Sequence, residues 1–230
     1  MINIPWLHSK FDDFPPTDNA LDSPNGLLAA GGDLSTNRLI SAYSRGIFPW
    51  FSEEEPILWW TPSPRCVVFP DQAHCSKSLA KLLRKSVYRV SFNEAFEQVI
   101  HLCGDTRKHF EGTWITEDLE AAYCQLHDLG YAHSVEVWKG DELVGGLYGV
   151  AINRVFFGES MFSLEANTSK IAFVKLAEIL VEKDYLLIDC QVTSQHLRSL
   201  GAVEIPREEF EQILQKNKRF STSPKPGSLN

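Results

Sequence analysis

The amino-acid sequence predicts an α+β protein with a small N-terminal domain followed by a larger C-terminal domain. Most of the prolines fall within the first 64 residues, where little regular structure is expected beyond one helix. The rest of the chain alternates between stretches with helical spacing and stretches with strand spacing of apolar residues. The expected domains are therefore 1–64 and 65–220, and the polar tail at 221–230 is expected to be disordered.

The first elements are predicted from caps and short apolar runs. A helix is expected at 36–45, with Ser35 as its N-cap and Gly46 at its end. An apolar strand at 67–69 follows the predicted domain boundary, and a helix at 76–85 comes next.

Two further helices precede the strands of the C-terminal part. The first is expected at 93–101, where apolar residues recur at helical spacing. The second is expected from Thr116 to about 129, because Thr116 is a good N-cap, acidic residues follow it and Gly130 can end the helix.

Three consecutive strands predict an antiparallel meander, because short polar turns separate them at 139–142 and 153–154. The strands are expected at 133–138, 143–152 and 155–162. The elements expected after the meander are a long helix at 168–182, a strand at 186–192, a short helix at 194–200, a strand at 202–205 and a helix at 207–215.

Composition and motifs exclude several classes of protein. No apolar run is long enough to span a membrane, and the N-terminus lacks a basic region followed by an apolar core, so a cytoplasmic protein without membrane contact is expected. The five cysteines form no CxxC pair, and the histidines show no ligand spacing, so no metal is expected. No P-loop, GxGxxG or GxSxG motif is present, so no cofactor is expected either.

Three polar residues interrupt strands that are otherwise apolar. Asp189 and Gln191 are two residues apart in the strand at 186–192, so alternation places them on one face. An unpaired buried carboxylate is costly, which leaves two readings, a structural hydrogen-bond network or a cavity on that face. Glu159 is a lone carboxylate among Phe and Met residues, which suggests an acidic spot beside an apolar pocket.

The formal net charge of −8 hides an uneven distribution of charge. The stretch from 72 to 93 contains no acidic residue and carries five basic ones. Four of these recur at helical spacing and share one face of the predicted helix: Lys77, Lys81, Arg84 and Lys85. The segregation indicates either a solvated surface or an anionic partner such as nucleic acid. Trp50 and Trp114 lie next to predicted helix ends, where aromatic side chains can stack on nucleobases or cover the core.

Taken together, these segments resemble the leucyl/phenylalanyl-tRNA–protein transferase family. The resemblance covers most of residues 24–210 in order. It is carried by the stretches at 24–29, 31–34, 45–51, 58–60, 112–115, 133–138, 143–150, 158–163, 188–191 and 196–201.

The resemblance implies a C-terminal domain similar to the GNAT acyltransferase fold and a defined reaction. The family moves an amino acid from Leu-tRNA or Phe-tRNA to an N-terminal Arg or Lys of a protein, which marks that protein for degradation under the N-end rule. The aminoacyl ester is already activated, so no ATP is needed. The junction at 163–169, where GNAT enzymes hold the pyrophosphate of CoA, contains no glycine, which disfavours a CoA donor.

The resemblance also implies roles for the unusual residues. Gln191 would contact the attacking amine, Asp189 would polarise Gln191, and Glu159 with Asp189 would attract the cationic N-terminus. Trp50 and Trp114 would bind the terminal adenosine, and the four basic residues of the helix face would bind tRNA. The pocket for the Leu or Phe side chain would be lined by Leu147, Phe156, Met161, Leu176 and Ile188.

Simple alternation places Phe156 and Met161 on opposite faces of their strand, so one pocket holding both requires a bulge or must span strand edges. Two other functions stay open. One is a CoA-dependent N-acyltransferase, and the other is a non-catalytic module that binds RNA or a peptide.

Overall fold

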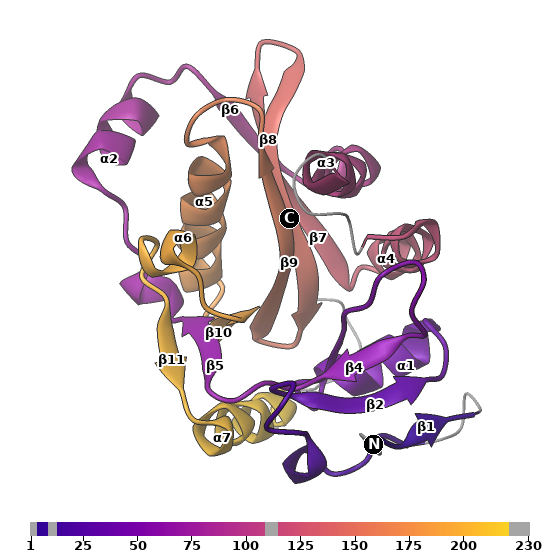
Figure 1. Cartoon of the computed structure of the whole chain (residues 1–230). Helices are drawn as coiled ribbons and strands as arrows, with labels where there is room; N and C mark the ends of the chain where they lie inside the picture. The colour runs from indigo at the N-terminus through magenta and orange to yellow at the C-terminus, as the bar shows by residue number, and fades with distance from the viewer. Residues whose placement is uncertain (1–3, 9–12, 109–114, 221–230) are drawn as a thin grey trace.

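The structure is a computed structural model, and it describes residues 4–8, 13–108 and 115–220. These residues form two sheets with helices around them (Figure 1). The first sheet has four strands in the order β1-β2-β4-β3, and the second has seven in the order β11-β5-β10-β9-β8-β7-β6. No helix in the described ranges is long and apolar enough to cross a membrane.

The N-terminal part contains a sheet that the sequence did not predict. Its strands and helices are β1 (Trp6–Leu7), the 3-10 helix η1 (Thr17–Asn19), β2 (Leu27–Gly31), α1 (Thr36–Tyr43), β3 (Phe48–Pro49) and β4 (Leu58–Trp60). The expectation of one helix and little else is therefore wrong. These strands are two to five residues long, too short for a periodic pattern, and they form by pairing with distant segments, as in the parallel pair of β1 with β2.

The seven-stranded sheet is built from the rest of the chain. Its strands are β5 (Arg65–Val68), β6 (Arg89–Phe92), β7 (Ala132–Lys139), β8 (Glu142–Ile152), β9 (Val155–Ser163), β10 (Leu187–Gln191) and β11 (Val203–Ile205). The accompanying helices are η2 (Pro70–Gln72), α2 (Lys77–Arg84), α3 (Phe96–Lys108), α4 (Glu117–Asp128), α5 (Thr168–Glu182), α6 (Gln195–Arg198) and α7 (Arg207–Lys218).

Most of the predicted elements are confirmed, because local signals define them. The antiparallel meander is β7–β8–β9, and the long helix is α5. Ser76 and Thr116 both cap their helices with a side-chain oxygen that accepts a backbone N–H. The prediction was wrong between residues 89 and 108, where β6 was missed and α3 begins three residues later and runs seven residues further than expected.

Helices cover both faces of the seven-stranded sheet (Figure 1). Helices α5 and α2 lie on one face, and their apolar side chains pack with strand residues such as Phe156 and Ile188 in one buried cluster. Helices α3 and α4 lie on the other face, where a second cluster includes Phe157 and continues into the N-terminal sheet. The burial of both faces explains why the central strands β8 and β9 are largely apolar.

A bulge interrupts β9 where it passes β8. Tyr148 pairs with Ser160, but the next residue, Gly149, pairs with Gly158, so Glu159 is the extra residue on the bulged strand. The bulge reverses the alternation of side chains beyond it. The bulge therefore changes which side chains of β9 share a face.

The parallel pair β9–β10 stops partway along both strands. The pairing ends at Phe157 opposite Asp189, whereas β9 continues to Ser163. In β10 a second irregularity follows at once, because the register against β5 shifts between Asp189 and Gln191. The two strands therefore lose their pairing at the positions of Glu159 and Gln191.

The bulge predicts a strict requirement for glycine at position 149. A Cβ there would lie 2.2 Å from the backbone oxygen of Phe157. We expect Gly149→Ala to lower the free energy of unfolding by about 1–3 kcal/mol, because backbone atoms must move to accept it. Gly104→Ala is the matched control, since the nearest atom would be 3.8 Å away, and it should be neutral or stabilising by up to about 1 kcal/mol. Urea unfolding measures both, and a Gly149→Ala protein as stable as the parent would contradict the bulge.

Candidate active site

A cavity of about 960 Å³ opens beside the divergence of β9 and β10. One wall comes from the N-terminal part, between Phe48 and Trp60. The other walls come from β8, β9 and α5, and from the segment that runs from β10 into α6. The cavity therefore forms only when the N-terminal sheet packs against the seven-stranded sheet.

The apolar part of the cavity contains all five side chains expected to form a pocket: Leu147, Phe156, Met161, Leu176 and Ile188. Phe173 of α5, which the sequence interpretation did not single out, lies on the same wall. A concave, mostly apolar wall of this kind suits a branched aliphatic or aromatic side chain.

The bulge at Glu159 explains how Phe156 and Met161 reach the same cavity. Without it, residues five positions apart in a strand lie on opposite faces. With one extra residue between them, both side chains pack with the cluster on the α5 face, whereas Phe157 and Phe162 pack on the other. Simple alternation, which places Phe156 and Met161 on opposite faces, is therefore wrong for this strand, and the bulge brings them together.

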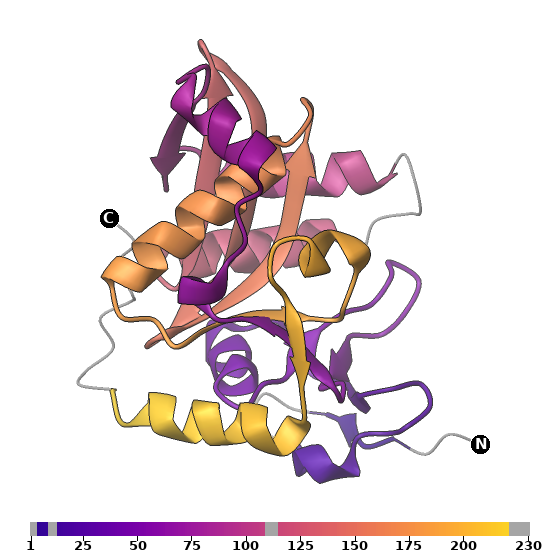
Figure 2. The ribbon, with the colours of Figure 1, turned by 90° about the vertical axis from the view of Figure 1, so that its left-hand side faces the viewer.

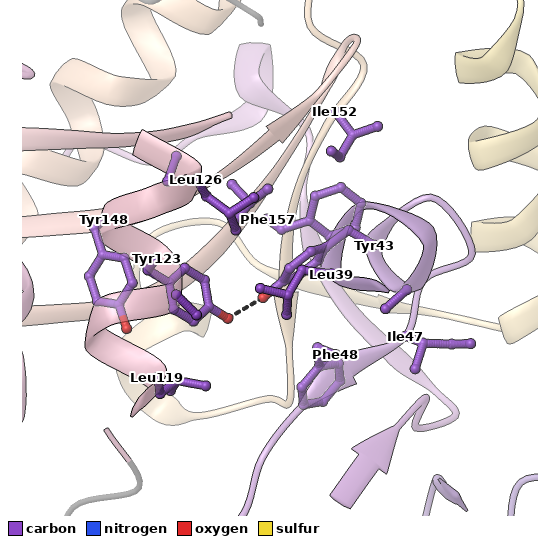
Figure 3. Close-up of a cluster of buried hydrophobic side chains, with 14 of the residues drawn as sticks. Leu39, Tyr43, Ile47, Phe48, Leu119, Tyr123, Leu126, Tyr148, Ile152 and Phe157 are labelled. Atoms are coloured by element: carbon purple, nitrogen blue, oxygen red, sulfur yellow. Dashed lines mark hydrogen bonds between the residues drawn. The ribbon is translucent and has the colours of Figure 1, made fainter. Parts of the chain in front are cut away.

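Glu159 is held by two tyrosine hydroxyl groups. Tyr43 of α1 donates to Oε1 at 2.7 Å, and Tyr123 of α4 donates to Oε2 at 2.8 Å. The two hydroxyl oxygens are also in contact, as the dashed line in Figure 3 shows. Because each hydroxyl group carries a single proton, all three contacts are hydrogen bonds only when Glu159 is itself protonated and donates to one of them. Both tyrosines are fully buried, and Glu159 lines the cavity. The contacts join the N-terminal part, α4 and β9 at one carboxyl group.

Burial raises the pKa of Glu159 to about 7, although the hydrogen bonds from the two tyrosines oppose this rise. The negative charge of Asp189 contributes to the same upward shift, and Arg65 opposes it. At physiological pH, a carboxyl group with a pKa near neutrality is present in both its protonated and its ionised form. The ionised form can attract a cation and can accept a proton. The sequence held no signal for the two tyrosines, because they occupy ordinary apolar positions of their helices.

Gln191 lines the cavity from an unusual backbone conformation. Its φ is +57°, in the left-handed region that non-glycine residues seldom adopt. Its side-chain nitrogen Nε2 donates to the backbone oxygen of Gly158 at 2.8 Å, across the divergence of β9 and β10. This contact fixes the carboxamide beside Glu159, the next residue of β9.

Asp189 has an environment that differs from the sequence interpretation. It is fully buried and is not part of the cavity wall. Arg65 donates to both carboxylate oxygens, from Nε to Oδ1 at 2.8 Å and from Nη2 to Oδ2 at 2.7 Å. Its contact with Gln191 is a hydrogen bond accepted from the backbone N–H at 3.0 Å, not one from the carboxamide.

The expectation that Asp189 and Gln191 share one face is wrong, because the register shift between them reverses the alternation. The sequence left open whether these residues belong to a structural hydrogen-bond network or line a cavity. Asp189 belongs to a buried network with Arg65, whereas Gln191 lines the cavity. Arg65 was missed, although an arginine opening an apolar strand of four residues was a usable signal.

The two tryptophans expected to bind adenosine are in different situations. Trp50 is 47% exposed and lines the cavity, where its ring lies 5.5 Å from that of Trp60. Trp60 Nε1 donates to the Trp50 backbone oxygen at 2.7 Å, which fixes the pair at the rim. Trp114 lies outside the described residues.

The basic residues expected to bind nucleic acid form one exposed surface, the basic face of α2, made of Lys77, Lys81, Arg84 and Lys85. Leu79 points the other way and is buried against the α5 side of the sheet. Figure 2 shows α2 lying across α5, away from α7. The basic face is separate from the cavity, since none of its residues lines it.

No group of three or more His, Cys, Asp or Glu side chains that could hold a metal ion occurs among the residues described. The cavity instead combines an apolar wall, a carboxyl group and a carboxamide. This arrangement is that of a site for a small apolar group joined to a polar reacting centre.

Comparison with protein families identifies the chain. Residues 67–215 match the family described as leucyl/phenylalanyl-tRNA protein transferase, and residues 32–63 match the N-terminal domain of that family. The chain therefore belongs to the leucyl/phenylalanyl-tRNA–protein transferase family.

Relatives with that name cover nearly the whole chain. The relative from Cellvibrio japonicus is 57% identical over 211 residues, which is 92% of this chain and 90% of that protein. The relative from Pseudomonas syringae pv. syringae is 55% identical over 214 residues, which is 93% of each protein. The relative from Pseudomonas aeruginosa PAO1 is 52% identical over 227 residues, which is 99% of each.

Two solved structures show a weak similarity to this chain. A conserved protein of unknown function from Bacteroides thetaiotaomicron has a TM-score of 0.42 at 12% identity, covering 66% of this chain and 56% of that one. An aminoglycoside acetyltransferase from an uncultured soil sample has a TM-score of 0.38 at 12% identity, covering 47% of this chain and 79% of that one.

The raised pKa of Glu159 predicts how stability depends on pH. Between about pH 4.5 and 7 the folded protein keeps this proton while the unfolded chain has lost it, so stability falls as pH rises through that window. We expect the melting temperature to fall less between about pH 5 and 7.5 in Glu159→Gln than in the parent.

Differential scanning calorimetry at both pH values measures this difference. Glu142→Gln, which changes an exposed carboxyl group on β8, serves as the matched control and should behave like the parent. An equal fall in melting temperature in Glu159→Gln and the parent would contradict the assignment.

Proposed function

We propose that this chain transfers leucine or phenylalanine from aminoacyl-tRNA to the α-amine of an N-terminal Arg or Lys of a protein, as an N-end rule enzyme. Family membership supports aminoacyl transfer from tRNA to protein. The single observation that carries the finer assignment is the cavity, whose apolar wall ends at Glu159 and Gln191.

The proposed reaction is aminolysis of an ester. The nitrogen of the α-amine attacks the carbonyl carbon of the aminoacyl group, a C–N bond forms, and the bond to the ribose oxygen of the tRNA breaks. The amine loses one proton and the departing ribose oxygen gains one, so atoms balance without ATP or another reactant. The enzyme must therefore orient the amine and manage its proton.

Gln191 is proposed to orient the attacking amine. Because Nε2 is engaged with the Gly158 oxygen, the carboxamide oxygen Oε1 is the acceptor that this side chain can offer to an amine N–H. A neutral amide is a poor base, so we assign its contribution to orientation and to electrostatic stabilisation.

Glu159 is proposed to receive the cationic N-terminus. Its pKa of about 7 lets it attract the ammonium group when ionised and accept the proton that this group must lose. Tyr43 and Tyr123 hold both of its oxygens, so the carboxyl group keeps a fixed orientation while its charge changes. Asp189, expected to share this role, is instead proposed to act through the backbone of Gln191.

The donor is proposed to lie along the apolar wall that ends at Glu159 and Gln191. Leu147, Phe156, Met161, Leu176 and Ile188 would receive the Leu or Phe side chain, Trp50 and Trp114 would contact the terminal adenosine, and the basic face of α2 would contact the tRNA phosphates. The exposure of that basic face supports this arrangement, because phosphate contacts dominate protein–nucleic acid affinity.

We further propose a small N-terminal domain at 1–64 and a GNAT-like acyltransferase domain at 65–220. The mixed sheet, with a central parallel pair that diverges beside the cavity, supports this division. The boundary falls between β4 and β5, which belong to different sheets.

The proposed function predicts a peptide product whose mass is increased by one amino-acid residue. Purified protein incubated with Leu-tRNA or Phe-tRNA and a peptide that begins with Arg should add one Leu or Phe residue to that peptide, as mass spectrometry detects. The same peptide with an acetylated N-terminus is the matched control and should stay unchanged, because its α-nitrogen is no longer a nucleophile.

The same assay separates the other two functions. Transfer of an acetyl group from acetyl-CoA, with none from aminoacyl-tRNA, would favour a CoA-dependent N-acyltransferase. Binding of tRNA or peptide without any transfer would favour a non-catalytic module. Either outcome would overturn the proposal.

A charge reversal tests the basic face of α2. The double variant Lys81→Glu and Arg84→Glu should weaken tRNA binding and make the slope of log affinity against log salt shallower by about 1–2. Lys216→Glu with Lys218→Glu, on exposed positions of α7, makes the same change in net charge and is the matched control. Filter binding at several salt concentrations measures both, and equal slopes in the two variants would count against the surface.

A further inference from the structure

Arg65, the first residue of β5, is enclosed by three segments that are far apart in the sequence. Its side chain is 1% exposed, and two of its three guanidinium nitrogens, Nε and Nη2, donate hydrogen bonds to Asp189 of β10. The guanidinium carbon lies 5.0 Å from the ring of Phe48 and 4.7 Å from the ring of Phe210. The position of the guanidinium plane is therefore determined from β3, β10 and α7 together.

Asp189 transmits this constraint to the backbone of Gln191. Its Oδ1 atom accepts from Arg65 Nε at 2.8 Å and from the Gln191 backbone N–H at 3.0 Å. An acceptor that Arg65 holds in place here stabilises a left-handed conformation that a glutamine would otherwise avoid. Lysine at position 65 would keep the charge but could not form the bidentate hydrogen bond with Asp189 or stack as a planar group against the rings of Phe48 and Phe210.

The left-handed backbone decides where the Gln191 side chain points. In a regular strand, residue 191 would share a face with Asp189, which faces Arg65 and lies outside the cavity wall. The irregular turn between the two residues brings Gln191 into the cavity wall, where Nε2 reaches the Gly158 oxygen. Loss of the Arg65–Asp189 contact would let position 191 relax towards the extended conformation and withdraw the carboxamide.

We propose that Arg65 is a positioning residue for the transfer reaction, acting through Asp189 to hold the Gln191 carboxamide at the cavity. The inference rests on the proposed function, because it requires that Gln191 contributes to the transfer. It makes Asp189 a link between Arg65 and Gln191, without contact to the substrate.

A double-mutant cycle between positions 65 and 191 tests this inference. Arg65→Lys, Gln191→Ala and the double variant are assayed for transfer of Phe from Phe-tRNA to a peptide that begins with Arg. We expect Arg65→Lys to lower kcat by about 10- to 100-fold, with KM for Phe-tRNA changed by less than about threefold. In the Gln191→Ala background the same change should lower kcat by less than about twofold, because the group that Arg65 positions is already absent.

Two further variants keep the test decisive. Phe210→Leu loosens the packing on the guanidinium from α7 without touching the cavity wall, and it replaces Arg65→Lys in the cycle if that variant does not fold. We expect a smaller loss of kcat that again disappears in the Gln191→Ala background. Arg207→Lys is the matched control, since Arg207 donates to the Thr61 backbone oxygen, and its kcat should stay within about twofold of the parent.

The outcomes separate this inference from the proposed function. A Gln191→Ala variant with parental kcat would overturn the assigned role of Gln191, and the positioning role of Arg65 with it. A lowered kcat in Gln191→Ala, together with an equal effect of Arg65→Lys in both backgrounds, would overturn the positioning role alone. Unchanged kcat in a folded Arg65→Lys variant would do the same.

Discussion

The buried ion pair between Arg65 and Asp189 is the constraint on which the rest of the site depends. Two charges that are each almost fully removed from water persist only when they are closely paired, and here Nε and Nη2 of Arg65 donate to the two carboxylate oxygens. Leaving one partner alone would cost about 3–5 kcal/mol. The rings of Phe48 and Phe210 exclude water from the pair, so the N-terminal sheet and α7 must both be in place for it to form.

The cavity lies where the regular sheet is interrupted. The bulge at Glu159 and the left-handed backbone of Gln191 each break the alternation of a strand, on neighbouring strands and at the same level. Each break turns a polar side chain towards space that a regular ladder would have filled. Gly149 permits the first, because any side chain there would collide with β9, and the Arg65–Asp189 pair supports the second.

The charge of this protein is unevenly distributed, so its net value does not describe any one surface. A net charge of −8 coexists with an exposed basic face on α2, separate from a cavity that holds a half-buried carboxyl group. The two features act at different ranges. An exposed basic surface attracts a polyanion over about 8 Å in physiological salt, whereas Glu159 acts by direct contact inside the cavity.

The amino-acid sequence alone predicted the meander, helix α5, the two capped helices, the basic face and the five apolar residues that meet in one cavity. These features follow from caps, periodicity and family motifs, which are local. Only the tertiary structure revealed the N-terminal sheet, the tyrosines around Glu159 and the partner of Asp189. Arg65 and Asp189 are 124 residues apart, and no local pattern links them. The two residues meet when strands β5 and β10 pair, and the fold is then stable only because Arg65 offsets the cost of burying the Asp189 carboxylate.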